Sequence, residues 1–240
     1  MTHGIFKPAL VALLALLFAL APFAVAFNGF DPDQYPVPQN NPPVQPAGYA
    51  FSIWGVIYLW LIAHGMFGLV KRRDDPDWDA MRWPLSVSLA LGTAWLSIAN
   101  ASPIWATIVI WIMWGGAVVA LVRAPRAEPF WASLPVGFYA GWLTAAASVS
   151  VGLVLAGYGL TSQVTAALVG LSIALGLSLA ILGLNRYRPK WGLAAGVVWA
   201  LLAVIVQNWP EGSRAVMAVA GLGIALILAQ LIRRTGRSAP

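Results

Sequence analysis

The sequence has no cysteine and few charged residues. Only 9% of its 240 residues are charged, against about 25% in soluble proteins. Without cysteine, disulfides, thiolate metal ligands and cysteine nucleophiles are excluded. Hydrophobic residues make up 60% of the chain, and the mean hydropathy is +0.78. This composition indicates an integral membrane protein.

The apolar residues fall into eight long segments. Each is close to the roughly 20 residues that a helix needs to cross the hydrocarbon core. The unbroken runs lack the alternation of barrel strands, so we expect an all-α membrane protein, an eight-helix bundle. The expected helices are near residues 7–27, 49–70, 83–101, 104–122, 134–157, 163–184, 191–207 and 215–232.

The first segment has two interpretations. Lys7, followed by an apolar run that ends in Ala24, Val25 and Ala26, is compatible with a cleavable secretory signal. We favour a retained helix, because the run from Pro8 to Phe27 is longer than the core of about 7 to 15 residues in a typical signal.

The basic residues predict the orientation. With the N-terminus in the cytoplasm, 13 of the 14 Lys and Arg residues fall on cytoplasmic segments, and only Arg214 falls outside. The positive-inside rule then places both termini in the cytoplasm, in a bacterial-type inner membrane. Because these residues flank apolar spans, they do not indicate a nucleic-acid surface. The 13 are Lys7, Lys71, Arg72, Arg73, Arg82, Arg123, Arg126, Arg186, Arg188, Lys190, Arg233, Arg234 and Arg237.

Ionisable residues are missing from the interiors of these segments. Proton- and ion-coupled transporters usually keep such groups at membrane depth. His64 is the one strongly pH-responsive side chain there, and we expect it to bond a carbonyl or another helix rather than to ligate haem iron. No nucleophile triad, phosphate loop or cluster of metal ligands appears. We therefore predict no catalytic or metal-binding residues, and binding is favoured over enzymatic activity.

The stretch from Pro42 to Trp60 runs from a proline-rich loop into an aromatic helix. Helical spacing places Phe51, Trp54 and Tyr58 on one face once the helix starts at Tyr49. One interpretation is a stacking wall for a flat apolar ligand, with the loop of residues 28–48 as a lid on the outer side. The other is a helix-helix seam.

Thirteen tryptophans are the other unusual feature. We expect those at segment ends to lie in the membrane interface, with the ring in apolar surroundings and the N–H near water. These are Trp78, Trp83, Trp131, Trp191 and Trp209. The deeper ones are Trp54, Trp95, Trp111, Trp114, Trp142 and Trp199.

Roughly Phe6 to Gly157 resembles the tryptophan-rich sensory protein family, also called the translocator protein or peripheral benzodiazepine receptor family. The stretch PAGYAFSIWGVIY resembles the run that enters its second helix. GTAW resembles the third-helix motif, and YAGWLTAA resembles the fifth-helix motif. The chain departs from the pattern in that Tyr49 replaces a tryptophan, Phe51 and Trp54 are one residue closer, and the outer loop has no tryptophan.

The resemblance implies a five-helix core in residues 1–160, followed by three further helices in residues 161–240. It implies a receptor for porphyrin-like or other flat hydrophobic molecules, in a sensory or transport role. A transporter without carboxylate-based proton coupling and a tetrapyrrole-modifying enzyme are the alternatives. No cofactor is required, although porphyrin or haem is an expected ligand. Lipid and the ligand are the expected partners, and a homodimer is left open. The implied ligand-binding residues are Pro43, Pro46, Tyr49, Phe51, Trp54, Tyr58, Trp95, Tyr139, Trp142 and Ala146.

Overall fold

A computed structural model describes residues 4–27, 29–184 and 190–235. Within these ranges the chain is helical and has no strand, which confirms the expected fold class. The α-helices are α1 (Phe6–Ala24), α2 (Ile53–Val70), α3 (Pro76–Ala101), α4 (Pro103–Arg123), α5 (Ser133–Gly157), α6 (Gln163–Gly183), α7 (Trp191–Asn208) and α8 (Arg214–Thr235). Two 3-10 helices, η1 (Pro32–Gln34) and η2 (Gly48–Ser52), lie between α1 and α2. The described residues contain eight helices that are long and apolar enough to cross a membrane.

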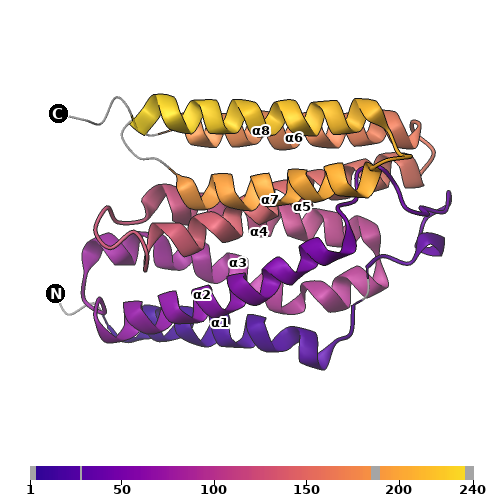
Figure 1. Ribbon diagram of the computed structural model, residues 1–240. Helices are drawn as coiled ribbons and strands as arrows, with labels where there is room; N and C mark the ends of the chain where they lie inside the picture. The colour runs from indigo at the N-terminus through magenta and orange to yellow at the C-terminus, as the bar shows by residue number, and fades with distance from the viewer. Residues whose placement is uncertain (1–3, 28, 185–189, 236–240) are drawn as a thin grey trace.

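Helix α5 lies at the centre of the bundle. It packs against α4, α6 and α7, while α1 packs against α2 and α3. Successive helices alternate in direction, so both ends of the chain lie at one end of the bundle and the loop between α1 and α2 lies at the other (Figure 1).

Glycines bring α5 and α7 into close contact. Gly137 and Gly141 of α5 face Gly192 and Gly196 of α7. A Cβ atom at Gly196 would lie 2.6 Å from the carbonyl oxygen of Phe138. Small residues at such a crossing allow two backbones to approach within van der Waals contact, which drives helix association in lipid. The position of α7 relative to α5 is therefore fixed by backbone contact.

Helix α3 begins seven residues before the predicted position near residue 83. Asp75 is its N-cap and accepts a hydrogen bond from the backbone N–H of Asp77, and Pro76 occupies the first turn. These local signals extend the helix beyond the apolar run. As a result Asp77, Asp79 and Arg82 lie in its first turns, contrary to the expectation that the charges lie outside the helices.

Helix α2 also differs from its prediction. The chain forms the 3-10 helix η2 before α2 begins at Ile53, so Phe51 is not in register with the helix. The buried face of α2 consists of Ile53, Ile57, Leu61, His64, Gly65 and Gly68. Trp54 and Tyr58 flank this face instead of forming it. The predicted face of Phe51, Trp54 and Tyr58 is therefore rotated about the axis of α2 relative to the buried face.

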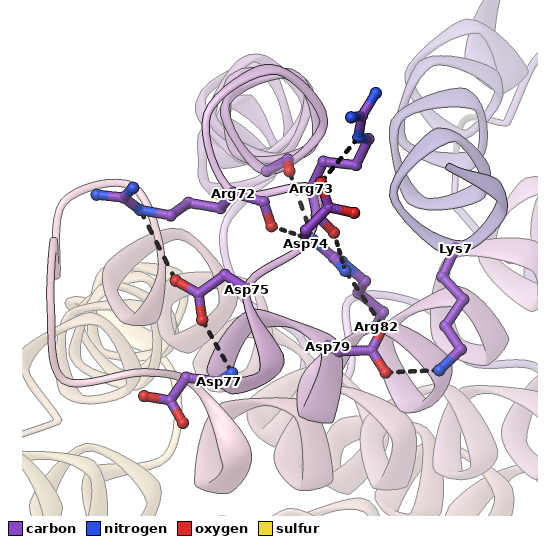
Figure 2. A network of polar contacts seen from close by, with 9 residues as sticks. Lys7, Arg72, Arg73, Asp74, Asp75, Asp77, Asp79 and Arg82 are labelled. Carbon is purple, nitrogen blue, oxygen red and sulfur yellow. Dashed lines mark hydrogen bonds and ion pairs between the residues drawn. The ribbon is translucent and has the colours of Figure 1, made fainter. Parts of the chain in front are cut away.

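A polar network joins three helices at the end of the bundle that carries the termini (Figure 2). Lys7 of α1 pairs with Asp79 of α3 at 2.5 Å, and Asp79 also pairs with Arg82 at 3.2 Å. Arg82 is buried and donates to the carbonyl oxygens of Arg72 and Arg73, at 2.6 and 2.9 Å. A cation at this position stabilises the carboxyl end of α2. Asp79 thus has a structural role in joining α1 to α3.

Arg72 connects this network to the loop between α4 and α5. Its guanidinium makes a two-fold hydrogen bond with the Glu128 carboxylate. These hydrogen bonds hold the pKa of Glu128 below its ordinary value. The pair ties two loops together at the same end of the bundle.

The tryptophans expected in the membrane interface differ in how exposed they are. Trp83, Trp191 and Trp209 are exposed, as expected for interface residues. Trp78 is instead 1% exposed and stacks on His64, with ring centroids 5.2 Å apart. The interface expectation is wrong for Trp78, because α3 starts early and turns this side chain into the bundle.

A candidate ligand cavity

One cavity lies between α5, the last helices and the loop that precedes α2. Its empty volume is about 820 Å³, counting the part open to the outside. Ligand pockets have mainly apolar walls and a few polar groups, as this wall does. The wall is formed by Phe27, Gly29, Phe30, Gln45, Pro46, Phe51, Trp95, Ile110, Trp142, Ala145, Ala146, Ser148, Val149, Ser150, Leu153, Gly170, Leu171, Ala174, Ala200, Leu201 and Val204.

Five of the predicted ligand-binding residues line this cavity: Pro46, Phe51, Trp95, Trp142 and Ala146. They come from the outer loop, η2, α3 and α5. Phe51 meets Trp142 edge to face, with ring centroids 5.9 Å apart. The structure thus brings together residues that are up to 100 positions apart in the sequence, from Pro46 to Ala146.

The indole N–H of Trp142 has no hydrogen-bond partner among the described residues. Trp142 is 2% exposed, so water does not readily replace the missing partner. Trp95 in the same wall differs, because its N–H donates to the carbonyl oxygen of Ala106 at 3.0 Å. Leaving a buried donor unsatisfied costs about 1–3 kcal/mol. A ligand with an acceptor group at Trp142 would remove that cost.

Three other predicted residues, Trp54, Tyr58 and Tyr139, lie beside the cavity in an aromatic cluster. Phe18 of α1 fills the space between them, with ring centroids 5.6, 5.0 and 5.8 Å from theirs. The hydroxyl of Tyr139 is 2.9 Å from that of Ser88. Trp54 connects the cluster to the cavity wall, because its ring lies 6.1 Å from that of Trp142.

The remaining two predicted residues lie on the chain that leads into α2. The carbonyl oxygen of Pro43 accepts a hydrogen bond from Asn208 at 2.9 Å. Tyr49 is exposed and meets Trp199 edge to face. Both are therefore held by α7 and do not line the cavity.

Residues from the last helices complete the cavity, and sequence reasoning missed them. Gly170, Leu171 and Ala174 come from α6, and Ala200, Leu201 and Val204 come from α7. The resemblance to a five-helix family gave no reason to include them. The recurrence of small residues one turn apart, at Gly170 and Ala174, was the available signal.

His64 lies apart from this cavity. Its Nδ1 is 2.7 Å from the carbonyl oxygen of Trp131, so the ring nitrogen donates to a backbone acceptor, as predicted. Among the described residues, no group of three or more His, Asp or Glu side chains is arranged to hold a metal ion.

The helices and the cavity define a multi-pass membrane protein with an apolar pocket for a small molecule. Residues 7–233 match the family model described as TSPO-like protein. The chain therefore belongs to the TSPO-like family, and this membership indicates a membrane role in small-molecule binding or transport. The match continues into the segment of residues 161–240, as far as residue 233. Searches of curated proteins and of solved structures found no match.

Proposed function

We propose that the cavity binds a flat, largely apolar molecule of the porphyrin type, and that the protein acts as its membrane receptor or carrier. The main support is the wall itself, in which aromatic rings stand among small side chains and one ring, Trp142, has a buried N–H without a hydrogen-bond partner among the described residues. Porphyrin or haem would bind as a ligand and not as a permanent cofactor.

The wall suits a planar ligand. Phe51, Trp95 and Trp142 provide rings, and aromatic contacts contribute about 0.5–1.5 kcal/mol per pair beyond the burial of area. Ala145, Ala146 and other small residues leave room between these rings. The parts of the wall that α3 and η2 contribute are aromatic rings and not aliphatic side chains. Flat apolar molecules therefore fit the cavity better than long-chain lipids.

The charge distribution supports an orientation. The described end of the bundle with Lys7, Arg72, Arg82 and Arg126 carries most of the basic residues, and by the positive-inside rule it faces the cytoplasm of a bacterial-type cell. The loop before α2 then faces the periplasm. The ligand would reach the cavity from that outer side.

Binding is favoured over chemistry because no Asp, Glu, His, Lys or Arg lies in the described wall. General acid-base catalysis needs such groups within hydrogen-bonding reach of the substrate. Transport remains compatible with the cavity, provided that it is not driven through a carboxylate in the wall. Porphyrin flux into proteoliposomes, measured with and without a proton gradient, separates a carrier from a receptor.

The direct experiment is a titration of the purified protein with protoporphyrin IX, followed by the ligand's absorbance. We expect Trp142→Phe to weaken binding about threefold to tenfold, since the ring stays and one hydrogen bond is lost. Trp142→Ala should weaken it further.

Two variants serve as controls for this titration. Trp95→Phe removes an N–H that the backbone already uses, and Trp191→Ala removes an exposed ring at the opposite end of the bundle. Neither should lose the hydrogen bond to the ligand, and Trp191→Ala should bind like the wild type. Equal affinity of wild type, Trp142→Phe and Trp142→Ala would show that Trp142 serves packing alone.

A further inference from the structure

The chain from Pro43 to Ala50, here called the strap, is attached to α7 by three hydrogen bonds. The side chain of Asn208 donates to the carbonyl oxygen of Pro43 at 2.9 Å. The backbone N–H of Ala47 donates to the carbonyl oxygen of Ala203 at 3.1 Å. The indole of Trp199 donates to the carbonyl oxygen of Ala50 at 2.9 Å. These bonds are distributed along the whole strap, so α7 holds both its ends and its middle.

A side chain of the strap is also inserted between two helices. Val44 is 1% exposed. Its methyl groups lie against Gly152 of α5 and Gly170 of α6, at 3.0 and 3.3 Å from the positions that a Cβ atom would take there. The absence of side chains at these glycines creates the notch that Val44 occupies. The strap is therefore docked on α5 and α6 as well as tied to α7.

The strap is itself part of the cavity wall. Gln45 and Pro46 line the cavity from the loop side, and Ala200 and Val204 line it from α7. Helix α7 thus supplies one part of the cavity wall and holds another part, the strap, in place. In Figure 1 this loop lies at the end of the bundle opposite the two termini. Release of the strap from α7 would open that end of the cavity.

We infer that Asn208 and Trp199 are positioning residues for the ligand site: they keep the strap closed over the cavity, and ligand exchange requires the strap to leave α7. This inference rests on the proposed function for its ligand, but the closure itself can be measured without one. The contacts with α7 should then slow entry and exit alike.

Stopped-flow measurements with protoporphyrin IX test this kinetic claim. Asn208→Asp keeps the oxygen that accepts from the backbone N–H of Ser213 but loses the donor to Pro43, the one bond to the strap, and the donor to Val204 within α7. Trp199→Phe keeps the ring and loses the donor to Ala50. Each should raise both the association and the dissociation rate about fivefold, the factor expected for one lost hydrogen bond, with Kd changed less than twofold.

The neighbouring exposed Trp209 gives a matched control, and Trp209→Phe should leave both rates unchanged. A residue that only supported folding would lower the melting temperature and the fraction of active protein, and would not accelerate exchange. Unchanged rates in both Asn208→Asp and Trp199→Phe would overturn the inference.

The cysteine-free sequence allows the strap to be locked. Ala47→Cys together with Ala203→Cys places two thiols on residues whose backbones are hydrogen bonded. The oxidised protein should stop exchanging porphyrin, and reduction should restore exchange. Equal exchange in the oxidised and reduced forms would mean that the ligand enters by another route, and would refute the strap as the gate.

A ligand-free measurement separates this inference from the proposed function. A single Pro46→Cys replaces a buried strap residue, and its reaction with a thiol reagent reports opening. Adding Asn208→Asp should accelerate the reaction about fivefold. If labelling accelerates but no porphyrin binds, the strap inference stands and the proposed ligand is wrong. If labelling is unchanged, the inference falls whatever the ligand is.

Discussion

Indole N–H groups divide the tryptophans into those that donate a hydrogen bond within the fold and those that do not. Trp95, Trp114 and Trp199 each donate to an acceptor on another segment, at 3.0, 2.9 and 2.9 Å. The indole N–H groups of Trp78 and Trp142 have no hydrogen-bond partner among the described residues. Trp78 lies with His64 and Arg82 around a small cavity near the end of the bundle that carries the termini. Trp142 lies in the large one, which is why the ligand proposal depends on it.

At the residue scale, His64 is predicted to be dispensable for binding. His64→Gln retains an N–H that can donate to Trp131, and position 64 lies outside the large cavity's wall. Porphyrin affinity should stay within about twofold of the wild type. Loss of the porphyrin absorbance change in this variant would instead make His64 an axial ligand.

A second residue-scale prediction concerns Glu128 and pH. Because Arg72 lowers the pKa of Glu128 from its ordinary value of 4.5, the pair stabilises the folded state above pH 4.5, and this contribution is lost as the pH falls through the lower folded-state pKa. Wild type should therefore melt at a higher temperature than Glu128→Gln at pH 7, by a small margin because the pair is partly exposed to solvent. The difference in melting temperature between the wild type and Glu128→Gln should become smaller below pH 4.5. A margin that grows on acidification would contradict this sign.

At the scale of the elements, helix existence was easier to predict than helix contacts. Hydropathy located all eight spans, because lipid forces each backbone to satisfy its own hydrogen bonds. The start of α3 was missed, since Asp75, Pro76 and the buried Arg82 extend it into a charged stretch. The family resemblance pointed to the five residues of the cavity wall, two of which, Pro46 and Phe51, lie before α2. Periodicity did not reveal that Phe18 would fill the space between Trp54, Tyr58 and Tyr139, because a periodic pattern gives a face and not its partner.

The crossing of α5 and α7 yields a prediction about stability. Gly196→Ala would bring a Cβ atom within 2.6 Å of the carbonyl oxygen of Phe138, and backbone cannot easily move away. We expect a loss of roughly 1–3 kcal/mol, typical of overpacking, seen as a lower melting temperature in detergent. Gly176→Ala is the control, because nothing lies within 4 Å of the added carbon and the better helix propensity should make it neutral or stabilising. Equal melting temperatures of Gly196→Ala and the wild type would show that α5 and α7 can move apart at this crossing without loss of stability.

At the scale of the whole molecule, the alternating helices separate a basic end from an end with the strap. Single cysteines at Asn40 and Ser162, both exposed at the strap end, should react with an impermeant thiol reagent applied from the periplasm. Cysteines at Asp74 and Arg126, exposed at the basic end, should react only after the membrane is opened. The reverse pattern would invert the orientation and place the strap in the cytoplasm.

If the cavity is the ligand site, a large side chain placed in it should block binding. Ala146→Phe places a ring in the wall from α5, while Val206→Phe makes a similar change at a position that is 51% exposed. Both variants would be titrated with protoporphyrin IX after their folding is checked by melting temperature. We expect Ala146→Phe to lower affinity more than about tenfold, the equivalent of 1.4 kcal/mol, and Val206→Phe to bind like the wild type. Undiminished binding by a folded Ala146→Phe protein would contradict the cavity as the ligand site.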